Sequence, residues 1–200
     1  MTATKLARCL RGLDSPSTGP IAAFRLARQA MLAGRRVDMQ DLAAELGVAR
    51  ATLFRWVGNR DQLLAEVIWS TAEPTWRHAV EEAQGAGAER VVAAYDRFVR
   101  DVIAAEFFAR YLRREPERAL RLLTTKASGF QHRLVAEFER LLRHEHATQD
   151  MCLPLPAADL AYLMVRIAES FIYSDLITGE TPDATKATDA IRVLLGAYAA

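Results

Sequence analysis

Four side chains between residues 50 and 55 have the types and spacing needed to contact the edges of nucleic-acid bases. Arg50 and Arg55 can each pair bidentately with a guanine, and Ala51 and Thr52 can touch a thymine methyl group. At helical spacing these residues share the outward side of one short helix. The expected chemistry is base recognition in a DNA major groove.

The surrounding sequence supplies the elements that such a helix needs. Residues 39–57, MQDLAAELGVARATLFRWV, carry apolar residues at helical spacing on both sides of Gly47, with Leu42 and Leu53 directed toward a common interior. A glycine at this corner suits the left-handed backbone in which many helices end. The pattern predicts a helix-turn-helix with an outward second helix.

Three further residues complete the expected contact surface. Phe54 and Trp56 lie at the edge of the second helix. Arg60 follows at the start of the next helix, where a phosphate can meet both a guanidinium group and free backbone amides. Surface helices commonly carry arginines, so a solvated face is the alternative for each single residue.

Composition describes an ordinary soluble chain, but its charge is unevenly distributed. The 200 residues are 51% hydrophobic and 26% charged, with a net charge of +1. Residues 1–60 hold ten Lys and Arg against four Asp and Glu, whereas the remainder is acidic. This asymmetry indicates that only the N-terminal part contacts a polyanion, unless the arginines cluster by chance.

No other pattern is typical of catalysis or metal binding. Cys9 and Cys152 have neither a metal-ligand spacing nor a disulfide framework, which fits free thiols in a reducing cytoplasm. His132, His144 and His146 make no recognisable metal site. We therefore expect no catalytic residue, no metal and no cofactor, although an enzyme without a local signature stays an alternative. No apolar run reaches the length of a membrane span and no secretion signal is present, so we expect a cytoplasmic protein without membrane contact.

Helical periodicity dominates the chain, and no segment alternates like a strand. We predict an all-α protein of about nine helices, four of them before Gly85 and five over 89–112, 116–123, 124–146, 157–178 and 184–199. Pro74 interrupts the fourth helix, which must kink or restart there, and the kink is a candidate hinge. The first 18 residues mix basic residues with Gly, Ser and Pro, which predicts a flexible arm.

The sequence VDMQDLAAELGVARATLFRWVGNRDQLL resembles the N-terminal DNA-binding domain of the TetR family of bacterial transcriptional regulators, over about residues 20–68. Phe54 stands where the family usually has a phosphate-contacting Tyr, Trp56 where it has Tyr or His, and Arg60 where it has Lys. Ala49 replaces the usual Ser cap, which weakens the start of the second helix by about 0.5 to 2 kcal/mol.

The resemblance implies a homodimer whose two outward helices enter the half-sites of a pseudo-palindromic operator. Segment 160–177, LAYLMVRIAESFIYSDLI, has apolar residues on more than one side and suits dimerisation together with the last helix. An intramolecular core is the alternative. The expected interface residues are Leu160, Met164, Ile167, Phe171, Ile191, Leu194, Leu195 and Tyr198.

The resemblance also implies a small effector bound by the C-terminal helices. The stretch RIAESFIYSDLITGETPD is similar to the QsdR-type subgroup, whose effectors are lactones of the quorum-signal kind. Such a ligand suits an apolar pocket with few polar anchors. Glu169 is a carboxylate in an apolar helix and must be paired, hydrated or used in binding. The expected ligand residues are Phe98, Phe107, Tyr111, Phe130, Arg166, Glu169 and Tyr173, of which the aromatic ones have plain core packing as their alternative.

These observations predict a flexible arm (1–18), a three-helix helix-turn-helix domain that binds DNA (19–66) and a helical domain for ligand binding and dimerisation (67–200). The expected function is that of a dimeric repressor, released from its operator by a small apolar effector such as a lactone or acyl-homoserine lactone. The alternative is a helical small-molecule-binding protein or enzyme with a degenerate motif that does not bind DNA.

Overall fold

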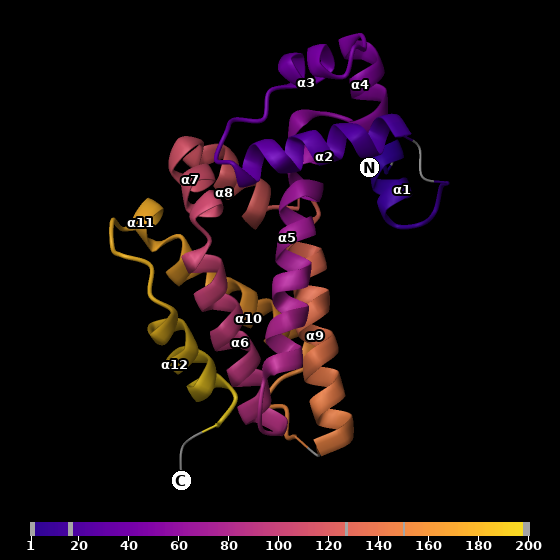
Figure 1. Cartoon of the computed structure of the whole chain (residues 1–200). Coiled ribbons are helices and arrows are strands. Elements are labelled where there is room, and N and C mark those ends of the chain that lie inside the picture. Colours follow the sequence, from indigo (N-terminus) through magenta and orange to yellow (C-terminus); the bar gives the residue numbers. More distant parts are fainter. Residues whose placement is uncertain (1–2, 16–17, 127, 150, 198–200) are drawn as a thin grey trace. The chain divides into compact units, whose positions relative to one another are not determined.

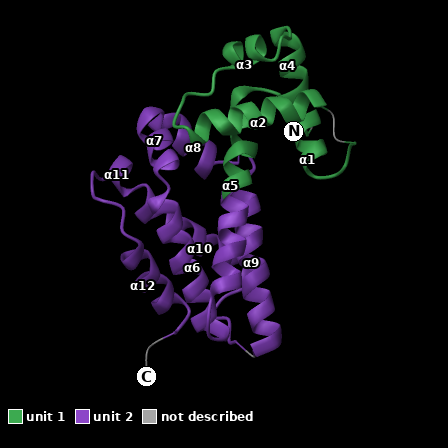
Figure 2. Cartoon of the chain, viewed as in Figure 1, with its two compact units in different colours: residues 1–71 green, residues 72–200 purple. Residues whose placement is uncertain are grey.

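The computed structural model describes residues 3–15, 18–126, 128–149 and 151–197, which form helices and no strand (Figure 1). The all-α prediction is confirmed. The chain divides into two compact units, residues 1–71 and 72–200 (Figure 2). Each unit has its own set of packed helices and is described separately.

Unit 1 holds the helix-turn-helix. Its elements are α1 (Lys5–Leu10), α2 (Thr18–Leu32), α3 (Met39–Glu45), α4 (Arg50–Val57) and the first part of α5 (Arg60–Glu82). Helix α2 packs against α1, α3 and α4. The side chains of Leu6, Ala23, Ala27, Leu53 and Val57 are fully buried, which accounts for the apolar spacing along these short helices.

Helix α1 replaces the expected flexible arm over the described part of residues 1–18. Thr4 caps it by accepting a hydrogen bond of 3.1 Å from the Ala7 amide, and Leu6 and Cys9 are buried as α1 packs against α2 and α4. Two of the basic residues pair within the unit, since Arg8 contacts Asp14 at 2.8 Å and Arg11 contacts Glu66 at 3.8 Å. The helix follows from the apolar spacing of Leu6, Cys9 and Leu10, which composition alone does not reveal.

Unit 2 is a bundle of longer helices. It contains α6 (Gly87–Ala104), α7 (Glu106–Arg114), α8 (Pro116–Thr124), α9 (Phe130–Gln149), α10 (Ala157–Ile172), α11 (Ser174–Ile177) and α12 (Ala184–Leu194). Helix α10 packs against α9 and α12, and α12 packs against α6. An aromatic cluster fills part of the core, where the Trp76 ring stacks on Phe138 with centroids 4.1 Å apart.

A buried ion pair joins the start of α6 to α9. The Glu145 side chain is 1% exposed and accepts hydrogen bonds from the Gly87 amide, at 2.9 Å, and from Arg90. Arg90 also donates to the Val80 carbonyl at 3.1 Å. Because a buried charge must be paired, loss of either partner should destabilise the bundle.

The described residues contain twelve helices where about nine were predicted. Helix α1 accounts for one, and the other two arise because the backbone breaks at Ala105 and at Tyr173. Neither break has a nearby proline or glycine, so no residue type in the sequence indicates it. Conversely, α5 does not restart at Pro74, which lies inside the helix.

Candidate functional site

The corner between α3 and α4 has the geometry that the sequence predicts. Gly47 has a φ of 66°, in the left-handed region that strongly favours glycine. Asp38 caps α3 by accepting from the Gln40 amide at 2.7 Å, and these backbone hydrogen bonds hold the pKa of Asp38 below its ordinary value. Ala49, at the corresponding position of α4, makes no side-chain cap.

Helix α4 has one buried and one exposed side. Leu53 and Val57 are fully buried, whereas the predicted contact residues Arg50, Ala51, Phe54 and Arg55 are exposed and Thr52 is half-buried. The Arg50 guanidinium lies 5.9 Å from the centroid of the Phe54 ring. A short helix with two exposed arginines can present both to a polyanion.

Trp56 faces the fold and differs in this respect from its neighbours on α4. A Cβ atom placed on Gly19 of α2 would lie 2.4 Å from the indole ring, so the ring rests against the backbone of α2. Trp56 is half-buried accordingly. The ring therefore packs between α2 and α4, and its contact with DNA stays a prediction.

Arg60 begins α5 and is tied to the loop before α3. Its Nε donates a hydrogen bond to the Val37 carbonyl, and the side chain is half-buried. The turn before it forms the predicted capping arrangement: Asn59 accepts from the Gln62 amide at 2.9 Å, and Gln62 accepts from the Asn59 amide at 2.9 Å. Arg60 is therefore held at a well-defined helix start.

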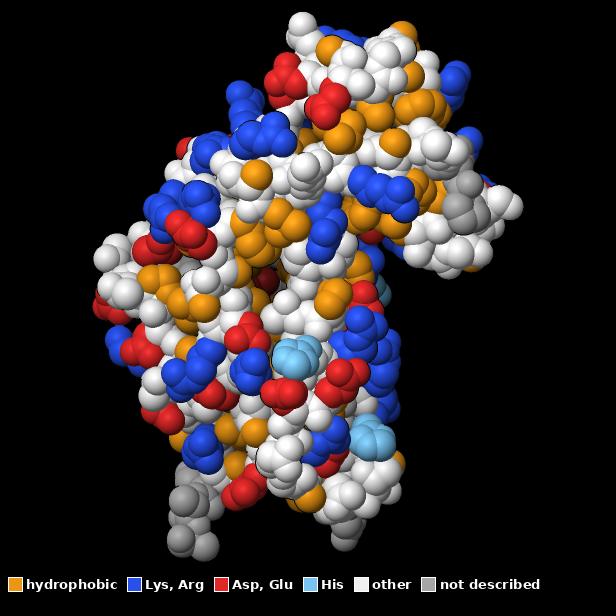
Figure 3. Space-filling model, in the orientation of Figure 1, with side chains coloured by type: hydrophobic (Ala, Val, Ile, Leu, Met, Phe, Trp, Pro, Cys, Tyr) orange, Lys and Arg blue, Asp and Glu red, His pale blue; other side chains and the backbone are white. Residues whose placement is uncertain are grey.

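The two units differ in net charge. Residues 1–71 contain ten Lys and Arg against six Asp and Glu, and residues 72–200 contain sixteen against nineteen. On the face in Figure 3, basic side chains are spread over unit 1 with a few acidic ones, and basic and acidic side chains are intermingled over unit 2. The basic unit is the one with the exposed arginines of α4.

Unit 2 contains a polar cluster among apolar helices. Glu169 of α10 is 6% exposed and accepts from Arg166 at 2.5 Å and from Gln131 of α9 at 3.4 Å. Burial raises the pKa of Glu169 to about 7, against the lowering effects of Arg166 and Gln131. Burial, with nearby Glu169 and Tyr111, also raises the pKa of Tyr173, so its phenol stays protonated.

Most of the predicted ligand residues lie in or beside this cluster. Tyr111, Phe130 and Tyr173 are buried, and Phe107 is half-buried. Phe98 belongs elsewhere, because its ring contacts Trp76 at 5.5 Å and Phe138 at 5.9 Å in the aromatic core. Gln131 was missed, since a single glutamine on an amphipathic helix carries no local signal.

The residues predicted for a dimer interface divide by burial. Leu160, Met164 and Ile191 have no exposed surface and Leu195 has 6%, so they form the core of unit 2 instead of an outer face. Ile167, Phe171 and Leu194 are half-buried, and Tyr198 lies outside the described residues. The exposed apolar residues of α10 and α12 are Tyr162, at 50%, and Val193, at 61%, which the sequence argument did not select.

Known proteins resemble the chain in both sequence and fold. The family profile described as "Tetracyclin repressor-like, C-terminal domain" matches residues 86–196. The solved structure of the R. erythropolis transcriptional repressor QsdR, from the TetR family, is 31% identical. It superposes with a TM-score of 0.82 over 89% of this chain and 94% of QsdR. The chain belongs to the TetR family of transcriptional regulators.

Three further searches bear on the function of the chain. The search among curated proteins gave no match. Within the described residues, no helix is long and apolar enough to cross a membrane, and no group of three or more His, Cys, Asp or Glu is arranged to hold a metal ion. The family assignment identifies the chain as a DNA-binding, ligand-responsive transcriptional regulator.

Proposed function

We propose that this TetR-family regulator is a homodimeric repressor that binds a pseudo-palindromic operator through α4 and leaves it when an effector binds. The observation that carries the proposal is the exposed face of α4 above its buried anchors Leu53 and Val57. Arg50 and Arg55 supply hydrogen bonds to base edges or phosphates on that face. Ala51 and Thr52 supply small groups that tolerate close approach.

Dimerisation brings two copies of α4 to one operator. Successive major grooves on one side of DNA lie about 34 to 36 Å apart, so both half-sites are reached only when the dimer fixes this spacing. We infer that α10 and α12 form the interface, with Tyr162 and Val193 at its centre. Replacing Val193 with Asp should convert dimer to monomer in size-exclusion chromatography with light scattering, whereas Glu180→Gln on an exposed loop should not.

The effector is a small, largely apolar molecule bound near Glu169. Phe107, Tyr111 and Phe130 supply apolar surface, and Arg166, Glu169 and Tyr173 supply polar groups. Lactones and acyl-homoserine lactones fit this mixture, because they combine an apolar chain with a few hydrogen-bonding atoms. Binding there would lower operator affinity by favouring a dimer whose reading helices no longer match the groove spacing.

Selection of bound sequences from a random DNA pool tests the proposal directly. We expect a palindrome whose half-sites are one or more helical turns apart, and reduced transcription from a promoter that carries it. Arg50→Ala and Arg55→Ala should each weaken operator binding by about 1 to 3 kcal/mol, whereas Arg143→Ala, exposed on α9, should leave it unchanged. Absence of any saturable, salt-sensitive complex would favour a small-molecule-binding protein with a degenerate motif.

A further inference from the structure

The polar cluster of unit 2 specifies the chemistry of a ligand more narrowly than its apolar surroundings do. Three helices contribute to it: α7 through Tyr111, α9 through Gln131, and α10 through Glu169 and its C-cap residue Tyr173. Three of these side chains are more than nine-tenths buried, at 7%, 6% and 5% exposure for Tyr111, Glu169 and Tyr173. Polar groups in such positions normally have hydrogen-bond partners.

Glu169 has capacity for a further donor. An ionised carboxyl group offers about four lone-pair sites, and within the described chain its hydrogen bonds come from Arg166 and Gln131. The contact from Gln131, at 3.4 Å, is at the long limit of hydrogen bonding, so the Oε1 atom is only weakly satisfied. An N–H or O–H group of a ligand would complete its coordination.

Tyr173 can supply a hydrogen-bond donor to the same ligand. Its side chain is 5% exposed, and its hydroxyl makes no hydrogen bond to any residue that the structure describes. Glu169 and Tyr111 are close enough to influence it electrostatically. A phenol O–H in this position can donate to a carbonyl oxygen of a ligand.

We infer that the cluster recognises an uncharged ligand with adjacent hydrogen-bond donor and acceptor groups, such as a secondary amide on an apolar chain. The amide N–H donates to Glu169, and the amide carbonyl accepts from the Tyr173 hydroxyl. This inference rests on the proposed effector role of unit 2 and restricts it. A free carboxylate is rejected, because it would place a second negative charge beside Glu169. A plain lactone binds less tightly, because it has no donor for Glu169.

Calorimetric titration of the full-length protein with matched ligands tests this inference. The probes are N-alkyl amides of hexanoic to dodecanoic acid, the same amides methylated on nitrogen, γ-lactones of equal chain length and the free acids. We expect the secondary amides to bind about ten- to hundredfold more tightly than their N-methyl counterparts, as for loss of one hydrogen bond to a charged group. The free acids should bind most weakly.

Two variants test the roles of Tyr173 and Glu169 separately. Tyr173→Phe should weaken the secondary and the methylated amides by the same factor, because both retain the carbonyl. Glu169→Gln should reduce the preference for the secondary amide, because the variant side chain is uncharged. Glu180→Gln on the loop before α12 is a matched control that should change neither affinity. Thermal unfolding of each variant establishes that it is folded.

The possible outcomes separate this inference from the proposed function. Equal binding of secondary and methylated amides, or tighter binding of lactones or acids, would overturn the donor requirement while an effector role remained. Absence of binding by every probe would also overturn it, and a normal operator titration in the same preparation would leave the DNA-binding function standing. Amide affinities that stay unchanged in Tyr173→Phe, together with a preference that stays unchanged in Glu169→Gln, would place the ligand away from the cluster and overturn the inference.

Discussion

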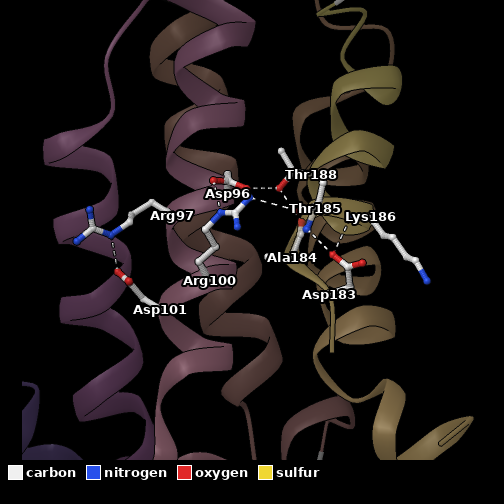
Figure 4. A network of polar contacts seen from close by, with 9 residues as sticks. All are labelled: Asp96, Arg97, Arg100, Asp101, Asp183, Ala184, Thr185, Lys186 and Thr188. Atoms are coloured by element: carbon white, nitrogen blue, oxygen red, sulfur yellow. Dashed lines mark hydrogen bonds and ion pairs between the residues drawn. The ribbon is translucent and has the colours of Figure 1, made fainter. Parts of the chain in front are cut away.

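Thr188 of α12 donates a hydrogen bond of 2.7 Å to the Asp96 carboxylate of α6, and this contact joins two helices far apart in the sequence (Figure 4). Asp96 also accepts from Arg100 at 2.7 Å, and Arg100 reaches Thr185 at 3.5 Å. Although burial alone would raise it, these hydrogen bonds hold the pKa of Asp96 below its ordinary value. The network therefore fixes α12, a proposed dimerisation helix, onto the bundle.

Thr188→Val should destabilise unit 2 by about 1 to 2 kcal/mol in urea unfolding, because valine keeps the shape and removes the donor to a charged acceptor. The hydroxyl also lies 2.8 Å from the Ala184 carbonyl, so its single hydrogen serves only one acceptor at a time, which limits the loss. The difference from wild type should shrink as the pH falls through the pKa of Asp96 in the folded protein, which lies below the ordinary value of 3.8, because the carboxylate then becomes protonated.

Thr185→Val is the control for this prediction, since Thr185 is exposed and its contact with Arg100 is long. We expect a change of less than about 0.5 kcal/mol. An equal loss of stability in both variants would show that the hydrogen bond from Thr188 to Asp96 contributes no more than the long contact of Thr185.

The contact between Gly19 and Trp56 predicts a steric coupling within unit 1. Gly19→Ala should lower stability by about 1 to 3 kcal/mol, because the new methyl group would lie 2.4 Å from the indole ring and the ring must move. Displacement of the ring would also shift α4, so operator affinity should fall with stability.

A double-mutant cycle tests whether the Trp56 ring causes the destabilisation by Gly19→Ala. In a Trp56→Ala background, Gly19→Ala should be close to neutral, because the atoms with which it collides are gone. If Gly19→Ala were equally costly in both backgrounds, backbone conformation rather than the ring would be responsible.

Local signals in the sequence were sufficient to predict most of unit 1. Gly47, the Asp38 cap and the Asn59–Gln62 pair act within a few residues of one another, so their geometry follows from residue type and spacing. The exposed positions of Arg50 and Arg55 follow in turn from the buried spacing of Leu53 and Val57.

The residues of unit 2 were harder to assign, because their roles depend on contacts between distant segments. Apolar periodicity identified Leu160, Met164 and Ile191 as inward residues but could not tell an intramolecular neighbour from a second subunit. Glu169 was recognisable as a carboxylate in an apolar helix, whereas its partner Gln131 lies 38 positions away and only the fold brings them together. The packing of Trp56 against α2 was missed for the same reason, since Gly19 carries no sign of the ring that rests on it.

The uncapped start of α4 predicts a stabilising substitution. Ala49 occupies the N-cap with an extended backbone and no side-chain hydrogen bond. Ala49→Ser should raise the free energy of unfolding by about 0.5 to 2 kcal/mol, because its hydroxyl can accept from an amide of the first turn. Ala51→Ser, on the exposed side of the same helix, should not stabilise. A gain in both variants would show that the cap is not the cause.

Glu169 predicts a pH dependence of stability with a definite sign. Its pKa in the folded protein is about 7 against an ordinary value of 4.5, because burial penalises the ionised form more than Arg166 and Gln131 offset it. Tyr173, which interacts with Glu169 electrostatically, has a raised pKa and stays neutral over this range. The folded state therefore binds more protons than the unfolded state between these two values, and stability falls as the pH rises from 4.5 to 7.

Glu169→Gln removes this proton linkage, so its melting temperature relative to wild type should rise between about pH 5 and about pH 8. Glu180→Gln, whose side chain is 68% exposed, should show no such trend. A relative melting temperature that stays constant or falls over this interval would mean that the carboxyl group is ionised throughout, with Arg166 outweighing burial.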